Sequence, residues 1–326
     1  MSGCQRLPDR TNVETDSDAE RRKAVSSQFN ATPSLDDLPL LCTSYHSGET
    51  LSSDRMSRYR PHGPNEGIDR DLRFLTAENI STKNIMDYTY ADIAKMIDHS
   101  LLNPTLSAAD LEAGCRLAVA YDVASVCIMP FALRRCVDLL KGSTVKASTT
   151  IGFPHGGHTT EIKRAEAERA IADGCEELDM VVNISQVLSG QWDYVRADIQ
   201  AVIEVAHAAG QKVKVIFENC YLNDAQKIEL CRICSDLNAD WVKTSTGYGT
   251  GGATHDDLKL MREHSAPHVQ VKAAGGVRDL DGLLAVRALG VSRCGASRTK
   301  DMLDEARRRL NLPVIEQFFA AQSSGY

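Results

Sequence analysis

Residues 240–252 read D-W-V-K-T-S-T-G-Y-G-T-G-G. The apolar start of this stretch predicts a short strand, which brings Lys243 to a loop rich in hydroxyls and glycines. A second predicted strand, over 269–273, repeats the arrangement and places Lys272 just before a glycine pair. Lysine is seldom fully buried unless it has a partner or a chemical role. Two strands that each end in a lysine and a glycine loop therefore indicate a ligand site.

The two lysines together suggest amine chemistry. Two buried amines at matching strand ends repel one another, and both this repulsion and the loss of solvation lower an amine's pKa. A lowered pKa favours the neutral, nucleophilic form of the amine. The sequence therefore predicts an enzyme that forms a Schiff base through a lysine.

The strand, loop and helix pattern around residues 240–252 continues through most of the chain. Alternating apolar residues predict eight strands, over 97–99, 125–129, 146–151, 177–182, 212–218, 241–244, 269–273 and 292–295. Helical spacing predicts a helix after each strand, over 107–120, 131–140, 159–173, 192–209, 224–237, 255–264, 280–289 and 300–321. Eight consecutive units of this kind predict a closed TIM (β/α)8 barrel, whose active site lies at the carboxyl ends of the strands.

Alternation within each strand separates the side chains that face the helices from those that face the barrel interior. A purely structural barrel needs only apolar layers inside, whereas this interior is polar near the strand ends. Buried ion pairs would explain one aspartate and one lysine, but not two lysines that each precede a glycine loop. We therefore interpret the inward set as an active site. Its members are Asp98, Cys127, Asp179, Lys243 and Lys272.

The glycines after Lys243 match G-x-G-x-x-G between a strand and a helix. The acidic ribose partner expected about twenty residues further on is absent, which argues against a dinucleotide site. We interpret the loop as one that binds a phosphate monoester, because barrel phosphate sites are built from the loops after the seventh and eighth strands. The candidate phosphate-binding residues are Gly247, Gly275, Gly276 and Ser297, with Arg278 or Arg298 as a source of positive charge.

The ten cysteines predict neither a disulfide framework nor a metal site. They are scattered, and many lie in apolar helical settings that are typical of reduced, packed thiols. Cys231 and Cys234 have no second Cys or His pair nearby, and His155 and His158 have no third ligand in view. We therefore predict no cofactor and no metal.

The net charge of −7 argues against a nucleic-acid or anionic membrane partner. No apolar run is long enough to span a bilayer, and the acidic N-terminus resembles neither a signal nor a transit peptide, so we expect a cytoplasmic protein. Residues 1–85 are polar and aperiodic, which predicts a largely disordered extension. The barrel domain is expected over 86–326, with a mobile C-terminal tail. A homodimer or a higher homo-oligomer is left open.

Six motifs in the same order resemble the deoxyribose-phosphate aldolase family, and the similarity covers about residues 88–298. The resemblance implies a class I, metal-independent aldolase. Such an enzyme reversibly cleaves 2-deoxy-D-ribose 5-phosphate to acetaldehyde and D-glyceraldehyde 3-phosphate in deoxyribonucleoside catabolism. The motifs are I-D-H-S-L-L around Asp98, V-C-I-M-P around Cys127, I-G-F-P-H-G at 151–156, E-L-D-M-V-V-N around Asp179, V-K-T-S-T-G around Lys243 and V-K-A-A-G-G-V-R around Lys272.

The resemblance also implies roles for single residues. Lys243 would form the Schiff base, and Lys272 would lower its pKa. Asp179 would move protons through a water molecule. Asp98 would hold and orient this network, and Cys127 would line the pocket beside the aldehyde.

Two features near the C-terminus need their own interpretation. Many family members have a second small polar residue where this chain has Arg298, so the phosphate site is either rearranged or gains a cation. Some members end in a tyrosine that assists proton transfer, and this chain ends at Tyr326; a terminus without function is the alternative.

Two other functions of the whole protein stay open: a Schiff-base barrel aldolase for a different sugar phosphate, and a scaffold protein without activity.

Overall fold

The structure, a computed structural model of the chain, describes residues 88–315. The predicted N-terminal extension and the predicted role of Tyr326 lie outside these residues and stay predictions. Within residues 88–315, no helix has both the length and the apolar character needed to cross a membrane.

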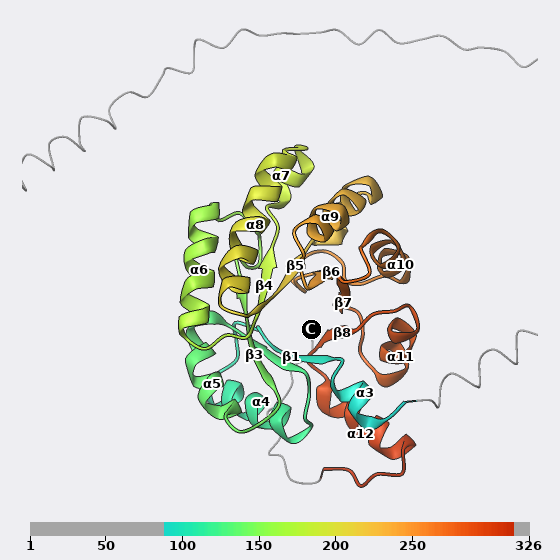
Figure 1. The fold of residues 1–326 in the computed structure, drawn as a ribbon. Helices are drawn as coiled ribbons and strands as arrows, with labels where there is room; N and C mark the ends of the chain where they lie inside the picture. Colours follow the sequence, from blue (N-terminus) through green and yellow to red (C-terminus); the bar gives the residue numbers. More distant parts are fainter. Residues whose placement is uncertain (1–87, 316–326) are drawn as a thin grey trace, which may run out of the picture. The chain divides into compact units, whose positions relative to one another are not determined.

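In this part of the chain, eight parallel strands close into a barrel in the order β1 to β8, each paired with its neighbours in sequence (Figure 1). This confirms the predicted TIM barrel. The strands are β1 (Ile97–Leu101), β2 (Ser125–Ile128), β3 (Lys146–Ile151), β4 (Glu177–Val181), β5 (Lys212–Ile216), β6 (Trp241–Lys243), β7 (Gln270–Ala274) and β8 (Arg293–Ala296).

The helices surround the ring of strands, and α3 lies beside α12 (Figure 1). The two five-residue helices α3 and α7 were not predicted, because so short a segment carries little periodicity. The helices are α3 (Tyr90–Ala94), α4 (Ala108–Ala120), α5 (Leu133–Leu140), α6 (Thr160–Ala172), α7 (Ile184–Leu188), α8 (Trp192–Ala208), α9 (Asp224–Asp236), α10 (His255–His264), α11 (Leu280–Ala288) and α12 (Thr299–Arg309), with 3-10 turns η1 (Pro130–Ala132) and η2 (Asn219–Tyr221).

Local signals set several of the helix ends. Ser107 caps α4 as predicted: its side chain accepts a hydrogen bond from the backbone N–H of Asp110, whose carboxylate accepts one from the backbone N–H of Ser107. Gly174 follows α6 with a φ of 96°, a left-handed conformation that glycine adopts at little cost.

The prediction for the last helix is wrong in its extent. The sequence predicted a helix over 300–321, but α12 ends at Arg309, and residues 312–315 have no regular structure. Asn311 takes a φ of 55°, which ends a helix in the way that a C-terminal glycine does. Pro313 then lacks the N–H that a continuing helix requires.

The predicted alternation inside the strands is confirmed. Leu178 and Met180 of β4 belong to the hydrophobic core, whereas Asp179 between them meets charged groups from other strands in the barrel interior. In the sheet register Lys243 of β6 stands directly opposite Lys272 of β7. The two amines therefore leave neighbouring strands at the same height and on the same side.

Candidate active site

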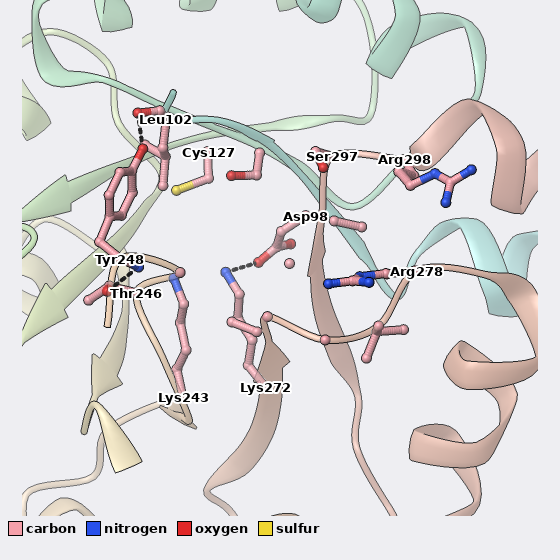
Figure 2. Close-up of a pocket in the computed structure, with 18 of the residues that line it drawn as sticks. Asp98, Leu102, Cys127, Lys243, Thr246, Tyr248, Lys272, Arg278, Ser297 and Arg298 are labelled. Atoms are coloured by element: carbon pink, nitrogen blue, oxygen red, sulfur yellow. Dashed lines mark hydrogen bonds and ion pairs between the residues drawn. The ribbon is translucent and has the colours of Figure 1, made fainter. Parts of the chain in front are cut away.

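A cavity of about 420 Å³ lies at the carboxyl ends of the strands, and Figure 2 shows its lining. Asp98, Cys127, Lys243 and Lys272 line it, as the sequence predicted. Asp179 does not line the cavity but lies against the two lysines, fully buried. The barrel thus brings all five predicted interior residues into one neighbourhood.

One carboxylate oxygen joins the two lysines. The Nζ atom of Lys243 donates to Oδ2 of Asp179 at 2.7 Å, and the Nζ atom of Lys272 donates to the same oxygen at 2.7 Å. Lys243 and Lys272 are 3 % and 1 % exposed, so water screens this contact little. A proton can therefore pass between the two amines through a single acceptor atom.

Asp98 holds the other side of Lys272, at 2.6 Å from Nζ (Figure 2). Its second oxygen lies 2.5 Å from Nη1 of Arg293, a residue of β8. Asp98 therefore orients Lys272 within the network, and it does not contact Lys243 in the way that Asp179 does.

Three charged residues beneath the cavity were missed as site residues. Lys214 of β5 is completely buried and lies 2.6 Å from Glu177 and 2.9 Å from Asp179. Arg293 donates to both oxygens of Glu177, at 3.0 and 2.8 Å. The sequence did contain a signal for Lys214. Val213 and Val215 on either side of it should face the helices, so strand alternation places Lys214 in the barrel interior.

The electrostatics of Lys243 agree with a nucleophilic amine. Burial lowers the pKa of Lys243 below its ordinary value; the Asp179 carboxylate opposes this shift, and the Lys272 ammonium adds to it. The predicted direction is therefore found at Lys243, with desolvation as the largest cause.

Lys272 behaves in the opposite way, so mutual repulsion does not act on the two amines alike. Burial alone would lower the pKa of Lys272, but Asp179 and Asp98 together raise it above its ordinary value. The physical reason is the number of carboxylates: among residues 88–315, Lys272 contacts two, whereas Lys243 contacts one, that of Asp179. Lys272 is therefore the more basic of the two amines, and Lys243 is the one that loses its proton more easily.

The two acidic partners stay ionised. Burial alone would raise the pKa of the Asp179 carboxyl, but the three lysines that it contacts hold the value well below its ordinary range. Asp98 is likewise held low, by Lys214, Lys272 and Arg293 against the effect of burial. For the Cys127 thiol, burial raises the pKa and the Asp179 charge raises it further, so Cys127 lines the cavity as a neutral group.

The candidate phosphate-binding residues line the same cavity. They are Gly247 from the loop after β6, Gly275 and Gly276 from the loop after β7, and Ser297 and Arg298 from the loop after β8. The glycines allow close backbone approach here, since Gly247, Gly275 and Gly276 all have a positive φ, at 91°, 73° and 90°.

The two candidate arginines differ. Both are exposed, but the guanidinium of Arg298 lies 3.1 Å from Asp301 on the first turn of α12, so part of its charge is already paired. Arg278 also lines the cavity, and Figure 2 shows its side chain extending toward the centre of the site. Within residues 88–315 no carboxylate lies within ion-pair distance of Arg278. Arg278 is therefore the better placed cation for an anionic ligand.

Gly252 permits a close contact between the loops after β6 and β7. A Cβ atom at this position would lie 2.6 Å from the carbonyl carbon of Gly275, and backbone cannot move aside as a flexible side chain can. We expect Gly252→Ala to destabilise the fold by about 1–3 kcal/mol and to raise KM for a phosphorylated substrate, because Gly275 shifts. Urea unfolding and steady-state kinetics measure the two effects.

Gly157→Ala is the matched control for this change. A Cβ atom at Gly157 has no neighbour within 4 Å, so this variant should change stability by no more than about 0.5 kcal/mol. Equal effects of the two substitutions would contradict the close-contact explanation.

The structure also tests the prediction that Cys231 and Cys234 are packed, reduced thiols. Cys231 and Cys234 are both buried in the hydrophobic core, which confirms that they pack as small apolar side chains. Burial raises the pKa of Cys231 to about 11, so its thiol stays protonated. His158 lies 3.1 Å from Glu166, and no cluster of three or more His, Cys, Asp or Glu side chains suited to a metal ion occurs within the described 88–315 range.

Comparison with known proteins agrees with this geometry. Residues 93–296 match the family described as DeoC/LacD family aldolase. The deoxyribose-phosphate aldolase of Rhodopirellula baltica is 71 % identical over 240 residues, which cover 74 % of this chain and 99 % of that protein. The deoxyribose-phosphate aldolase of Thermococcus gammatolerans is 44 % identical over 218 residues, which cover 66 % of this chain and 97 % of that protein.

Among solved structures, the deoxyribose phosphate aldolase of Aeropyrum pernix, described as having a unique tetrameric structure, superposes with a TM-score of 0.63. It is 29 % identical, and the match covers 68 % of this chain and 93 % of that one. The family match over residues 93–296 includes the strands that carry Asp98, Asp179, Lys243 and Lys272. The chain therefore belongs to the DeoC/LacD family of aldolases.

Proposed function

We propose that this chain is a class I aldolase that reversibly cleaves 2-deoxy-D-ribose 5-phosphate to acetaldehyde and D-glyceraldehyde 3-phosphate. The observation that carries the proposal is the pair Lys243 and Lys272 on one oxygen of Asp179, where Lys243 is the amine that loses its proton more easily. The names of the relatives support the choice of substrate. The reaction belongs to deoxyribonucleoside breakdown.

In the proposed reaction the neutral amine of Lys243 attacks the aldehyde carbon of the open-chain sugar. Loss of water from this adduct gives an iminium ion, which withdraws electrons from the neighbouring carbon–carbon bond. The bond breaks when the hydroxyl on the far carbon gives up its proton and becomes the aldehyde of glyceraldehyde 3-phosphate. The electron pair moves to the iminium and forms an enamine, which is then protonated and hydrolysed to acetaldehyde and free Lys243.

Asp179 and Lys272 manage the protons in this scheme. The Asp179 carboxylate lies within hydrogen-bond distance of both amines, so it can pass protons as the adduct on Lys243 forms and breaks down, either directly or through water. Lys272 stays charged and favours the uncharged state of Lys243 before the attack. Asp98 orients Lys272, and Cys127 forms part of the wall beside the reacting carbon.

We assign the substrate phosphate to the glycine loops and to the guanidinium of Arg278 beside them. Gly247, Gly275 and Gly276 offer backbone at the cavity edge, and Ser297 adds a hydroxyl. Arg278 supplies a guanidinium, the group that fits phosphate with two parallel hydrogen bonds.

Arg278→Ala is expected to raise KM for 2-deoxy-D-ribose 5-phosphate about 10- to 100-fold, because one charge-assisted hydrogen bond contributes about 1.5–3 kcal/mol. Steady-state kinetics with the phosphorylated sugar and with 2-deoxy-D-ribose measure this. Arg298→Ala is the matched control and should have a smaller effect, since the guanidinium of Arg298 is already paired with Asp301. An equal loss with the unphosphorylated sugar would contradict the assignment.

The proposed activity is tested directly by incubating the purified chain with 2-deoxy-D-ribose 5-phosphate and measuring both aldehyde products. A panel of other sugar phosphates separates this activity from that of a barrel aldolase with a different substrate. Failure to cleave any of them, with no adduct on Lys243 after borohydride reduction, would favour the scaffold function instead.

Three further predictions accompany this function. We propose a homo-oligomer, supported by the tetramer described for the Aeropyrum pernix relative and tested by light scattering. A cytoplasmic location and a role of Tyr326 in proton transfer stay predictions.

A further inference from the structure

A layer of charge lies below the cavity and does not touch it. We call Lys214, Glu177 and Arg293 the lower charge tier; none of them is among the residues that line the cavity. Lys214 is 0 % exposed and reaches three carboxylates, with Asp98 at 3.5 Å in addition to Glu177 and Asp179. Neither substrate binding nor the proposed proton path uses these residues.

The lower charge tier changes the net charge of the buried cluster around Lys243. Among residues 88–315, the interior cluster contains four basic groups and three carboxylates. The basic groups are Lys214, Lys243, Lys272 and Arg293, and the carboxylates are Asp98, Glu177 and Asp179. If every group were charged, the buried cluster would carry one excess positive charge, which is costly in a medium of low polarity. Release of one proton from a lysine removes that excess.

The contacts decide which lysine releases the proton. Within the described part of the chain, Lys214 contacts three carboxylates and Lys272 contacts two, whereas Lys243 contacts one, that of Asp179. Arg293 cannot take the role, because a guanidinium does not deprotonate in proteins. Lys243 therefore has the weakest hold on its proton and is also a lysine that faces the cavity.

We infer that the lower charge tier sets the number of protons in the cluster and thereby leaves Lys243 as its uncharged amine. Lys214, Glu177 and Arg293 are positioning residues that act through Asp98 and Asp179. The inference rests on the proposed function in so far as a neutral Lys243 serves catalysis, but the protonation of Lys243 can be measured without any reaction of the sugar.

The path from Lys214 to Lys243 is a single carboxylate. Lys214 donates to Oδ1 of Asp179, and Lys243 donates to Oδ2 of the same group. With the charge of Lys214 removed, Asp179 would have one cation fewer and would hold the proton of Lys243 more strongly. The other groups that face Lys243 are Lys272 from β7 and Cys127 from β2, and neither is changed by a substitution at Lys214.

Three variants are expected to change the pKa of Lys243 in three different ways. Lys214→Met makes the cluster neutral with Lys243 protonated, so the pKa of Lys243 should rise by about one to two pH units. Glu177→Gln increases the positive excess, so the same pKa should fall. The double variant Lys214→Met/Glu177→Gln restores the original excess of one, and the pKa should return close to that of the unchanged chain.

The measurement is the pH dependence of acetylation at Lys243 by acetic anhydride, because only a neutral amine reacts. Peptide mass mapping resolves Lys243 from the other lysines and needs no aldolase activity. The pH profile of kcat/KM gives a second readout, and its acidic limb should move in the same order. Lys212→Met is the matched control, since Lys212 begins the same strand but is exposed, and it should leave the labelling profile of Lys243 unchanged.

Opposite shifts in Lys214→Met and Glu177→Gln, with recovery in the double variant, support the inference. Shifts smaller than about 0.3 pH units in the folded variants, or shifts of the same sign, overturn it. Glu177→Gln and the double variant keep the test decisive if Lys214→Met fails to fold. If the labelling shifts occur but no sugar phosphate is cleaved, the proposed function fails while this inference stands.

Discussion

Replacing Lys243 with arginine is expected to abolish cleavage of 2-deoxy-D-ribose 5-phosphate while the barrel stays folded. The guanidinium can still donate to Asp179, but it remains charged and cannot act as a neutral nucleophile. Loss of the nucleophile in a covalent mechanism removes the whole reaction path, so kcat/KM should fall by at least about 10⁴-fold. Lys243→Met should give the same loss without the charge.

Imine formation at residue 243 is measured by trapping the imine with borohydride. Acetaldehyde and the Lys243 amine lose water to form an imine, and borohydride reduces that imine to a stable ethyl amine that mass mapping locates. We expect the ethyl group on Lys243 of the unchanged chain and none on this segment in Lys243→Arg. Lys259→Met, a change at an exposed lysine of α10, should trap as the unchanged chain does. An adduct of equal yield in Lys243→Met would exclude Lys243 as the nucleophile.

Replacing Asp179 with asparagine is expected to lower both activity and stability. Asp179 accepts from Lys214, Lys243 and Lys272 and is fully buried. Breaking a buried ion pair by removing one partner costs about 3–5 kcal/mol, and loss of a general acid–base group costs about 10²- to 10⁴-fold in rate. Unfolding curves measure the first effect. The second is measured by kcat and by deuterium exchange into the methyl group of acetaldehyde.

A second buried ion pair in the same barrel separates the two effects. Lys163 and Asp198 lie 2.5 Å apart, both with completely buried side chains, and neither lines the active-site cavity. Asp198→Asn should therefore reduce stability by a comparable amount without changing kcat in the folded fraction. A rate loss in Asp198→Asn as large as that in Asp179→Asn would mean that both variants act only through folding.

Asp179 is also expected to make the stability of the fold depend on pH in the acidic range. Its pKa is held well below the ordinary value in the folded state, so the carboxylate contributes stability at any pH above the unfolded pKa of about 3.9. That contribution is lost as the pH falls through the lower, folded pKa. Stability should therefore decline less steeply with acid in Asp179→Asn than in the unchanged chain, and urea unfolding between neutral and acidic pH measures the difference.

Much of the site could be predicted because strand parity is a local property. The alternation of Leu178, Asp179 and Met180 already indicates which side chain faces the barrel interior, and the same holds for Lys243 beside Val242. Eight repeated units then require that these inward side chains meet, since parallel strands in a closed barrel all end at the same rim. The glycine loops after Lys243 and Lys272 were predictable for the same reason.

The different behaviour of the two lysines could not be predicted in this way. Lys243 and Lys272 each follow a valine and precede a glycine loop, yet the pKa of one is lowered and that of the other raised. The difference comes from Asp98, which contacts Lys272 across a separation of 174 residues in the chain and does not contact Lys243. Lys214 likewise belongs to the cluster because it contacts Glu177 and Asp179, which are distant from it in the sequence.

The sequence by itself determined the barrel, the inward set of polar side chains and the glycine loops, because these depend on periodicity and on short-range backbone preferences. Only the tertiary structure decided which amine has the lowered pKa, which candidate arginine has no carboxylate partner among residues 88–315, and which charges lie beneath the cavity. The physical reason is that the electrostatic energy of a buried group depends on the number and distance of its charged neighbours. In this chain those neighbours come from strands β1, β4, β5, β7 and β8 and meet only when the barrel closes.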